Sequence, residues 1–449
     1  MQLSESFSKR IGKLTVSALK VINSDDKHMR EIVLGTSISF FMKFTGAGIN
    51  FGFNAYLARQ FGADGAGVYF IALSVATLSA MIGRAGLDNA LLRYVAYGAS
   101  VGDWSSVRSV YNKGFSTAII LSLLVSVCVY MSSSWLAIVL FRKESVELSI
   151  KYISFSILPV VLLTLYGEVL KGLKKIFLSQ IVQGMGFQLL CFTGLYIGSM
   201  YISSDIVAIY SYIFSAWTMA VIGAILWHKN IPRLNKLING FDYSRLISSA
   251  MPLFLVSALS LSYNWINTFL LGMWGTKSDV GIFSLAFRTA MLISFILVAV
   301  NTISAPKFAE IYKSGDIDLL ANTARKTLRL MFIVSTPILL FFLIFAPEIM
   351  AVFGDSFKVG ADTLIVLSLA QYVNVVAGSV GYLLIMTGNE VQVRNSNLFS
   401  AVICAILSVI LIPKYSYLGA GISVSIALLL RNVVEIYFVK KYLNIRILV

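Results

Sequence analysis

Two stripes of polar residues in otherwise apolar runs could bind a charged or sugar-bearing ligand. In the first run, over residues 32–56, Lys43 falls near the middle of the expected helix and shares one face with Asn50 and Asn54. A lysine at mid-membrane depth costs about 2.5–3.5 kcal/mol on insertion scales, so it is expected to face protein or a water-filled cavity. No acidic residue lies on that helix to neutralise it. A buried cation of this kind favours an anionic ligand, such as a phosphate.

The second stripe lies in the seventh apolar run and contains Asn264 and Asn267. Asparagines there could hydrogen-bond a neighbouring helix or line a hydrated cavity. Because Lys43 favours a cavity, we interpret both stripes as facing one central space. Arg288, in the eighth run, is expected to line it too, with snorkelling of the side chain to the membrane surface as the alternative. The predicted substrate-binding residues are Lys43, Asn50, Asn54, Asn264, Asn267 and Arg288.

Four further residues are candidates for a gate or for the cavity lining. Arg84 and Asp88 lie where the second apolar run ends, and their spacing would let the side chains pair. Anchoring of the helix end in the membrane surface is an equally good interpretation of this pair. Gln371 and Asn374, in the tenth run, are candidate lining residues.

The sequence lacks the motifs of several enzyme classes. It contains neither a Walker motif nor a Gly-x-Gly-x-x-Gly motif, so it is not expected to hydrolyse a nucleotide. Its three cysteines lie in apolar runs and its two histidines lie far apart, which predicts neither a disulfide framework nor a metal site. No loop is long enough for a catalytic domain. We therefore expect a protein that is not an enzyme, with no catalytic residues, metal or cofactor.

The composition is that of a polytopic membrane protein. Hydrophobic residues make up 58% of the chain and charged residues only 13%, whereas soluble domains contain about 25% charged residues. We predict an all-α fold with about twelve transmembrane helices in two six-helix bundles. The apolar runs cover 32–56, 67–85, 114–133, 150–170, 177–199, 205–227, 246–272, 280–303, 327–346, 361–386, 396–413 and 417–439. Within the last run, Arg431 has Glu435 one turn later, so an intrahelical ion pair is expected there.

The basic residues predict the orientation. If the N-terminus is cytoplasmic, lysine and arginine favour the cytoplasmic segments over the outer ones by roughly four to one, so both termini are expected inside. The net charge of +15 then reflects these loops and anionic lipid rather than nucleic acid. The predicted domains are a basic amphipathic segment on the cytoplasmic leaflet, a first bundle, a cytoplasmic linker, and a second bundle with a tail, over 1–30, 31–228, 229–245 and 246–449.

The two bundles are expected to be an internal repeat. One constant shift places residues 66–69 on 280–283 and Asn50 on Asn264. With six spans each, both halves enter the membrane in the same direction, so the repeat is parallel and its axis lies along the membrane normal.

Several short motifs resemble a known family. The first half contains Ala58-Arg59-Gln60-Phe61-Gly62, Gly67-Val68-Tyr69, Gly86-Leu87-Asp88 and Leu92-Arg93-Tyr94, and the second half contains related motifs over 280–283, 301–309 and 371–388. In this order, over about residues 30–440, they resemble Wzx-type polysaccharide flippases of the multidrug/oligosaccharidyl-lipid/polysaccharide exporter superfamily.

The resemblance implies a flippase of the bacterial inner membrane. Its substrate would be an undecaprenyl-pyrophosphate-linked oligosaccharide, an O-antigen or capsule repeat unit, moved from the cytoplasmic to the periplasmic leaflet by alternating access. Membrane lipid is an implied partner, and a polysaccharide polymerase and a chain-length regulator are candidate protein partners. The alternative is a multidrug–cation antiporter of the same superfamily, for which an acidic residue in the first span would be expected in place of Lys43. A glycosyltransferase or scaffold is disfavoured by the missing catalytic loops.

Overall fold

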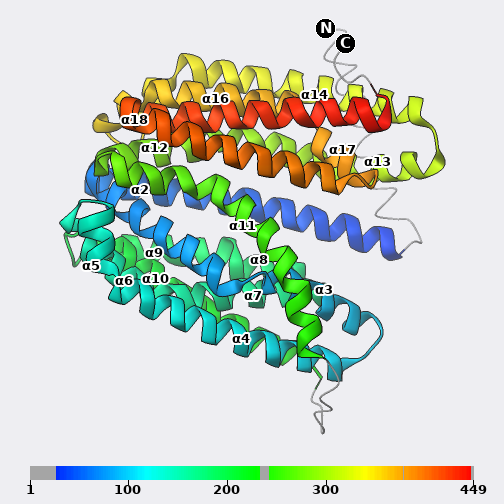
Figure 1. Ribbon diagram of the computed structural model, residues 1–449, viewed down its shortest axis with the longest axis horizontal. Coiled ribbons are helices and arrows are strands. Elements are labelled where there is room, and N and C mark those ends of the chain that lie inside the picture. Colours follow the sequence, from blue (N-terminus) through cyan, green and yellow to red (C-terminus); the bar gives the residue numbers. More distant parts are fainter. Residues whose placement is uncertain (1–26, 233–241, 378, 446–449) are drawn as a thin grey trace.

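The computed structural model describes residues 27–232, 242–377 and 379–445, without some helical side chains such as those of 27–39 and 255–264. The amphipathic segment predicted over 1–30 falls mostly outside these ranges, and the side chain of Asn264 falls outside them as well. The described residues form helices joined by short connections, arranged in two lobes (Figure 1).

The N-terminal lobe forms the lower layer in Figure 1, and α2 lies between it and the upper layer. Its helices are α2 (Lys27–Arg84), α3 (Leu87–Ser100), α4 (Trp104–Met131), α5 (Ser133–Trp135), α6 (Glu147–Ile153), α7 (Ile157–Gly172), α8 (Ile176–Gln183), α9 (Met185–Ser199) and α10 (Ile206–Asn230). A π-helical turn, η1 (Leu136–Leu140), continues the chain after α5.

The C-terminal lobe forms the upper layer. Its helices are α11 (Tyr243–Trp274), α12 (Lys277–Ala290), α13 (Phe295–Ser314), α14 (Ile317–Ile344), α15 (Ala346–Ala351), α16 (Ala361–Val376), α17 (Val380–Met386) and α18 (Glu390–Leu443), with the 3₁₀ turns η4 (Met291–Ser294) and η5 (Asp355–Gly360). The start of α11 rests on the other lobe, where Tyr94 Oη and Ser249 Oγ lie 2.6 Å apart.

Two long helices each contain a pair of the expected spans. In α2 the helix bends at Gly62, whose φ of 68° suits a residue without a Cβ. In α18 the bend lies at Ser416, with a φ of 48°, three residues after Pro413. Proline lacks the N–H that would donate to the residue four positions earlier, so it weakens the helix locally. Each bend separates two apolar runs that the sequence shows as distinct.

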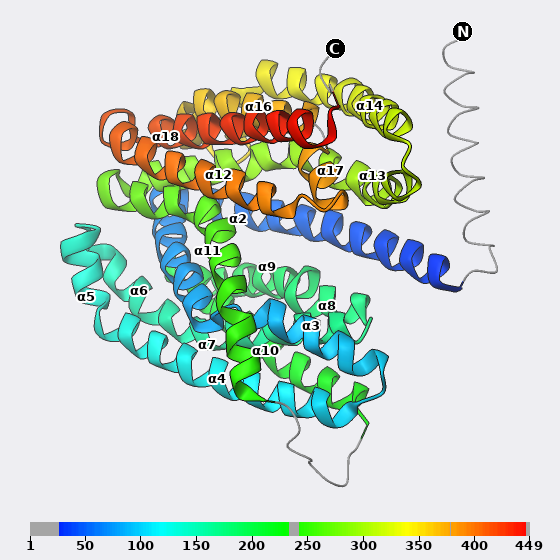
Figure 2. The same cartoon turned by 45° about the vertical axis from the view of Figure 1, so that its right-hand side comes forward.

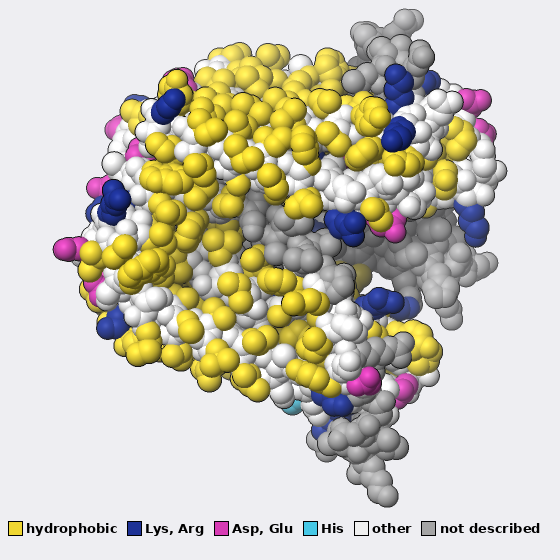
Figure 3. Space-filling view, viewed as in Figure 1, with side chains coloured by type: hydrophobic (Ala, Val, Ile, Leu, Met, Phe, Trp, Pro, Cys, Tyr) yellow, Lys and Arg dark blue, Asp and Glu magenta, His cyan; other side chains and the backbone are white. Residues whose placement is uncertain are grey.

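The described residues make a multi-span membrane protein. Within them, nine helical ranges are long and apolar enough to cross a membrane, and the two kinked helices are among these. Charged side chains gather toward the two ends of the molecule and hydrophobic side chains cover the sides between them (Figure 3). An apolar belt with polar ends is the surface expected of a protein that spans a bilayer.

Two of the expected spans are less regular than the sequence suggests. The run over 280–303 is split, because α12 ends at Ala290 and η4 leads into α13. The run over 177–199 is interrupted at Gly184, between α8 and α9, where φ is −124° and ψ is −111°. Both interruptions lie beside the cavity described below.

The lobes meet at the end where α2 bends and separate toward the end where α2 begins (Figure 2). At the closed end α2 packs directly on α12. A Cβ on Gly67 would overlap the carbonyl oxygen of Lys277, and a Cβ on Gly281 would lie 3.2 Å from the nitrogen of Gly67. Arg59 Nε also donates a hydrogen bond to the carbonyl of Val352 at 2.7 Å. Two glycines therefore allow a close backbone contact between the lobes.

A loop of the N-terminal lobe completes this closed end. Lys143 Nζ donates hydrogen bonds to the carbonyl oxygens of Gly272, at 2.6 Å, and Phe141, at 2.9 Å. Burial lowers the pKa of Lys143, because it disfavours the charged form of the amine. The ring of Phe141 packs edge-on against Phe269, with centroids 5.3 Å apart.

Candidate functional site

A cavity of about 370 Å³ lies between the lobes. The first arm of α2 forms one wall, α8 and α9 form the second, and the end of α12 with η4 forms the third. Four of the six predicted binding residues line it, namely Lys43, Asn50, Asn54 and Arg288. The structure therefore brings together residues that lie more than half of the chain apart in sequence.

The cavity is basic. Lys43 is an exposed residue on its wall, and Arg288 is half-buried on the opposite lobe. None of the described residues that line the cavity is an aspartate or glutamate, and no ion pair to either cation is found among the described residues. Two uncompensated cations in a partly enclosed space attract an anion, since the low surrounding polarity strengthens the interaction.

Aromatic rings hold Arg288 in place. Its guanidinium carbon lies 4.9 Å from the ring centroid of Phe70 in the N-terminal lobe and 5.3 Å from that of Trp265. Both distances are within the range of cation–π attraction, which stabilises the charge without neutralising it. The planar guanidinium remains a positively charged donor suited to a phosphate or carboxylate.

Side-chain amides lie beside these cations. Asn54 Nδ2 donates to Asn50 Oδ1 at 2.7 Å, so the two predicted asparagines orient one another. Gln188 Oε1 is buried next to Gly46 and has no hydrogen-bond partner among the described residues. A buried acceptor without a donor is costly, so this oxygen is ready to accept a hydrogen bond from a ligand.

Sequence reasoning missed Gln180 and Gln188, which both line the cavity. A signal was present, because Gln180, Gly184 and Gln188 recur every four residues in an apolar run and share one helical face. Gln183, a third glutamine of this region, points elsewhere. Its Nε2 donates to Glu168 at 3.3 Å and to Ser179 at 3.1 Å.

A second cavity of about 250 Å³ adjoins the first. Asn50, Asn54, Gln188 and Arg288 line both cavities. The remaining lining is mostly aromatic and comes mainly from the N-terminal lobe. It consists of Phe53, Tyr69, Phe70, Leu73, Thr77, Phe187, Cys191, Tyr212 and Trp265.

The prediction that Asn267 faces the cavity needs correction. Asn267 is fully buried between α11 and α18, where its Nδ2 donates to Cys404 Sγ at 3.2 Å and its Oδ1 accepts from Ser408 Oγ at 2.6 Å. The physical reason is that both hydrogen-bonding groups of the amide find partners on the packed neighbouring helix. The alternative interpretation of an asparagine stripe, hydrogen bonding between helices, therefore holds for this residue.

Gln371 and Asn374 also lie away from the cavity. Gln371 Oε1 accepts from Ser294 Oγ at 2.6 Å, and Asn374 Oδ1 accepts from Arg431 Nη2 at 2.8 Å. Both side chains are buried within the C-terminal lobe. They connect helices of that lobe and do not line the space between the lobes.

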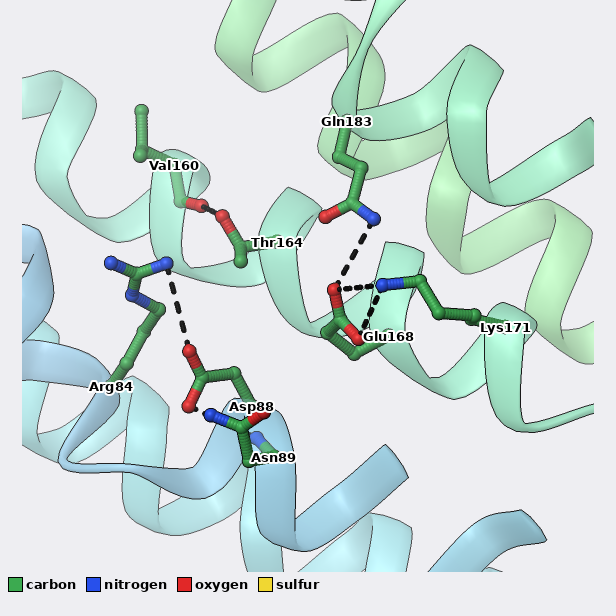
Figure 4. Close-up of polar contacts among 8 residues, drawn as sticks. All are labelled: Arg84, Asp88, Asn89, Val160, Thr164, Glu168, Lys171 and Gln183. Carbon is green, nitrogen blue, oxygen red and sulfur yellow. Dashed lines mark hydrogen bonds and ion pairs between the residues drawn. The ribbon is translucent and has the colours of Figure 1, made fainter. Parts of the chain in front are cut away.

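Arg84 and Asp88 pair as their spacing predicts, with 3.9 Å between Arg84 Nη1 and Asp88 Oδ2 (Figure 4). They do not share a helix, however. Arg84 ends α2 and Asp88 lies in the first turn of α3, and Ala85 and Gly86 between them both have positive φ. The pair therefore spans a sharp turn, and it is separate from the cavity lining.

Glu168 is a partly buried carboxylate of the N-terminal lobe. Figure 4 shows Lys171 and Gln183 converging on it, and the Lys171 Nζ–Glu168 Oε1 distance is 2.7 Å. Among the described residues, no group of three or more His, Cys, Asp and Glu side chains is arranged to hold a metal ion.

Comparison with known proteins connects this geometry to a family. Residues 32–312 match the model of the family described as polysaccharide biosynthesis protein, and residues 252–411 match MatE. The probable low-salt glycan biosynthesis flippase Agl15 of Haloferax volcanii is 22% identical over 421 residues, which cover 91% of this chain and 83% of that protein.

Two solved structures share the fold. Lipid II flippase MurJ, in an inward closed conformation, has a TM-score of 0.73 at 16% identity, covering 91% of this chain and 87% of its own. A multidrug resistance MATE family transporter, in an inward-facing conformation, has a TM-score of 0.66 at 17% identity, covering 89% of this chain and 98% of its own. Because the first family model matches more than half of the sequence, the chain belongs to the polysaccharide biosynthesis protein family of the multidrug/oligosaccharidyl-lipid/polysaccharide exporter superfamily.

Proposed function

We propose that this protein is a flippase that moves a polyprenyl-diphosphate-linked oligosaccharide from the cytoplasmic to the outer leaflet of the plasma membrane. The family is one of flippases rather than enzymes, as the sequence predicts. The observation that carries the proposal is the cavity between the lobes, which presents Lys43 and Arg288 without a carboxylate among its described lining residues. A diphosphate supplies the matching negative charge, and the neighbouring amides suit sugar hydroxyls.

Transport would proceed by alternating access between two bundles. We propose twelve crossings, which count both arms of α2 and of α18 separately and add α11 to the nine apolar helical ranges. Both termini would then lie on the same side of the membrane, which the basic residues assign to the cytoplasm. The proposed parallel repeat is supported by the contact between Gly67 and Gly281, because these glycines occupy equivalent positions in the two halves. In the proposed orientation the end at which the lobes meet is the outer one, so this state would be open toward the cytoplasm.

The finer assignment, an undecaprenyl-linked O-antigen or capsule unit in a bacterial inner membrane, rests on the motif resemblance. The cavity would contact the diphosphate and the sugars of such a substrate, and these groups are the same whichever polyprenol carries them. A polymerase and a chain-length regulator remain candidate partners on the same basis.

A cation antiporter is the second candidate, supported by the MatE match over residues 252–411. A cationic drug would need a negatively charged site. The basic lining of the cavity opposes such a ligand, since Lys43 and Arg288 would repel it.

The test is deletion of the gene in its source organism, followed by analysis of lipid-linked glycans and surface polymer. We expect glycan-bearing polyprenyl diphosphate to accumulate on the cytoplasmic side and the surface polymer to be lost. Wild-type protein should restore export and Lys43→Glu should not. Lys326→Glu, which changes an exposed lysine of α14 outside the cavity, is the matched control and should restore export.

Unchanged glycans together with a changed sensitivity to cationic drugs would contradict the flippase and favour the antiporter. Restoration of export by Lys43→Glu would show that the cavity charge is not used.

A further inference from the structure

We infer that the two adjoining cavities divide the substrate between them, with the diphosphate in the first and the adjacent sugar ring in the second. This inference rests on the proposed function and adds to it a separate sugar subsite. The division follows from the different linings of the two spaces, which are joined through Asn50, Asn54, Gln188 and Arg288.

The first cavity suits the diphosphate. Lys43 lines this cavity and is not part of the lining of the second, so only here can two cations act on one ligand. Its remaining walls include Met42, Met291, Leu292 and Phe295, and the Phe295 ring packs edge-on against the exposed ring of Phe44. An apolar edge beside a pair of cations matches the junction between a prenyl chain and its phosphates.

The second cavity suits a single sugar ring. Six of its lining residues are aromatic, and a pyranose has an apolar C–H face that packs on aromatic rings while its rim carries hydroxyls. Tyr69, Thr77 and Tyr212 supply hydroxyl groups around these rings. The volume of about 250 Å³ lies below the roughly 300–1,000 Å³ of sites for drug-sized ligands, so one ring fits better than a chain of sugars.

Unpaired hydrogen-bonding groups lie where the two spaces join. Gln188 Oε1 is buried without a partner among the described residues and can accept from a sugar hydroxyl. The Asn54–Asn50 hydrogen bond uses one group of each amide, which leaves Asn54 Oδ1 and Asn50 Nδ2 for a ligand. These groups complete a polar rim on an otherwise aromatic space.

Arg288 sets the boundary between the subsites. Phe70 and Trp265, which hold its guanidinium, line the second cavity, whereas the guanidinium borders both. The phosphate attached to the sugar would therefore lie against Arg288, and the phosphate attached to the prenyl chain would lie nearer Lys43. A lipid without a sugar would leave the second cavity unused.

The experiment compares the binding of two lipids to the purified full-length protein in nanodiscs. The probes are a polyprenyl diphosphate and the same lipid carrying one hexose. Thr77→Val and Tyr69→Phe remove one hydroxyl each with little change in shape, and Leu73→Phe fills the second cavity. We expect these variants to weaken binding of the hexose-bearing lipid by roughly 3- to 10-fold and to leave the bare diphosphate lipid unaffected.

Lys43→Ala is the comparison variant and should weaken both lipids alike. If the three second-cavity variants weaken both lipids equally, or neither, the sugar subsite is wrong while the diphosphate site stands. If the wild-type protein binds neither lipid, the proposed function itself fails. Thr77→Val keeps the test decisive should Leu73→Phe not fold, because it adds no atoms to the core.

Discussion

Two intramembrane arginines of the C-terminal lobe, Arg431 in α18 and Arg288 in α12, have opposite environments. In the C-terminal lobe, Arg431 Nε lies 3.9 Å from Glu435 Oε1 and Arg431 Nη2 donates to Asn374 at 2.8 Å. Between the lobes, Arg288 lies against two aromatic rings and its cavity has no carboxylate among the described lining residues. A neutralised arginine stabilises the packing of its own lobe, whereas a charge left without a counter-ion retains its affinity for a ligand.

The side-chain amides of Asn267 and Gln188 differ in the same way, one paired within the protein and one not. Asn267 has a partner for its Nδ2 and for its Oδ1 inside the C-terminal lobe, and Gln188 keeps a buried acceptor unpaired beside the cavity. Both are side-chain amides with a buried oxygen. What distinguishes a structural amide from a candidate binding amide here is whether the protein itself satisfies it.

The largest effect on stability is expected from breaking the neutralised pair. Glu435→Leu leaves Arg431 in the lobe without its carboxylate, and loss of one partner of a buried pair costs about 3–5 kcal/mol. Because Arg431 is about a quarter exposed, at 24%, we expect a loss at the lower end of that range. Thermal unfolding in detergent measures it.

The double variant Arg431→Met/Glu435→Leu is the control for that measurement. It removes both charges together and should recover most of the lost stability, since an apolar pair can replace a buried ion pair. If the double variant is as unstable as Glu435→Leu alone, the stability of the lobe depends on how these two side chains pack and not on the neutralisation of their charges.

Substitution of Lys43, the exposed cation of the cavity, should weaken ligand binding without lowering stability. Lys43→Ala is expected to weaken binding of a polyprenyl diphosphate by roughly 10- to 100-fold, because a hydrogen bond to a charged group contributes about 1.5–3 kcal/mol. Lys43→Glu should be worse, since it adds repulsion to the lost attraction. Neither change should lower the unfolding temperature, because the side chain is exposed to the cavity. Equal binding by wild type and both variants would remove Lys43 from the site.

A smaller difference in stability is expected between variants of the two amides, Asn267 and Gln188. Asn267→Leu removes the hydrogen bonds to Ser408 Oγ and Cys404 Sγ, while Ser408 Oγ keeps the carbonyl of Cys404 as an acceptor. It should destabilise the protein by about 1 kcal/mol. Gln188→Leu removes an unpaired acceptor, so it should leave stability unchanged or slightly higher while weakening substrate binding. Comparing the unfolding temperatures of the two variants decides this, and equal destabilisation would contradict the distinction.

Of these changes, a change in salt concentration should have the smallest effect on diphosphate binding and on stability. Between about 0.1 M and about 1 M salt, the Debye length falls from about 10 Å to about 3 Å. Diphosphate binding in the partly open cavity should weaken a few-fold over this range. The unfolding temperature should change little, because the Arg431–Glu435 pair is mostly shielded from solvent. Binding that is insensitive to salt would indicate that the cations contribute little to affinity.

The local sequence pattern was enough to predict which residues of the first span line the cavity. Lys43, Asn50 and Asn54 line the same cavity because helical periodicity places them on one face of α2. The kinks at Gly62 and Ser416 also fall between apolar runs that the sequence separates. Pairing of Arg431 with Glu435 follows from their spacing on one helix.

The same reasoning failed where a partner comes from far away in the chain. Asn267 has the residue type and helical position of a cavity residue. However, Ser408, which lies 141 residues later, donates a hydrogen bond to its Oδ1 inside the packed lobe. Gln188 shows the reverse, because it lies in an apolar run but borders a cavity whose other walls come from α2, α12 and η4.

The sequence by itself determined a multi-span helical protein, the polar face that contains Lys43, and the family to which the chain belongs, because composition, periodicity and short motifs are local properties. Only the tertiary structure decided which buried polar groups are already satisfied and which still lack a partner. That distinction depends on contacts between helices distant in sequence. It separates Asn267, whose amide is satisfied inside the C-terminal lobe, from Gln188, whose buried oxygen lacks a partner beside the cavity.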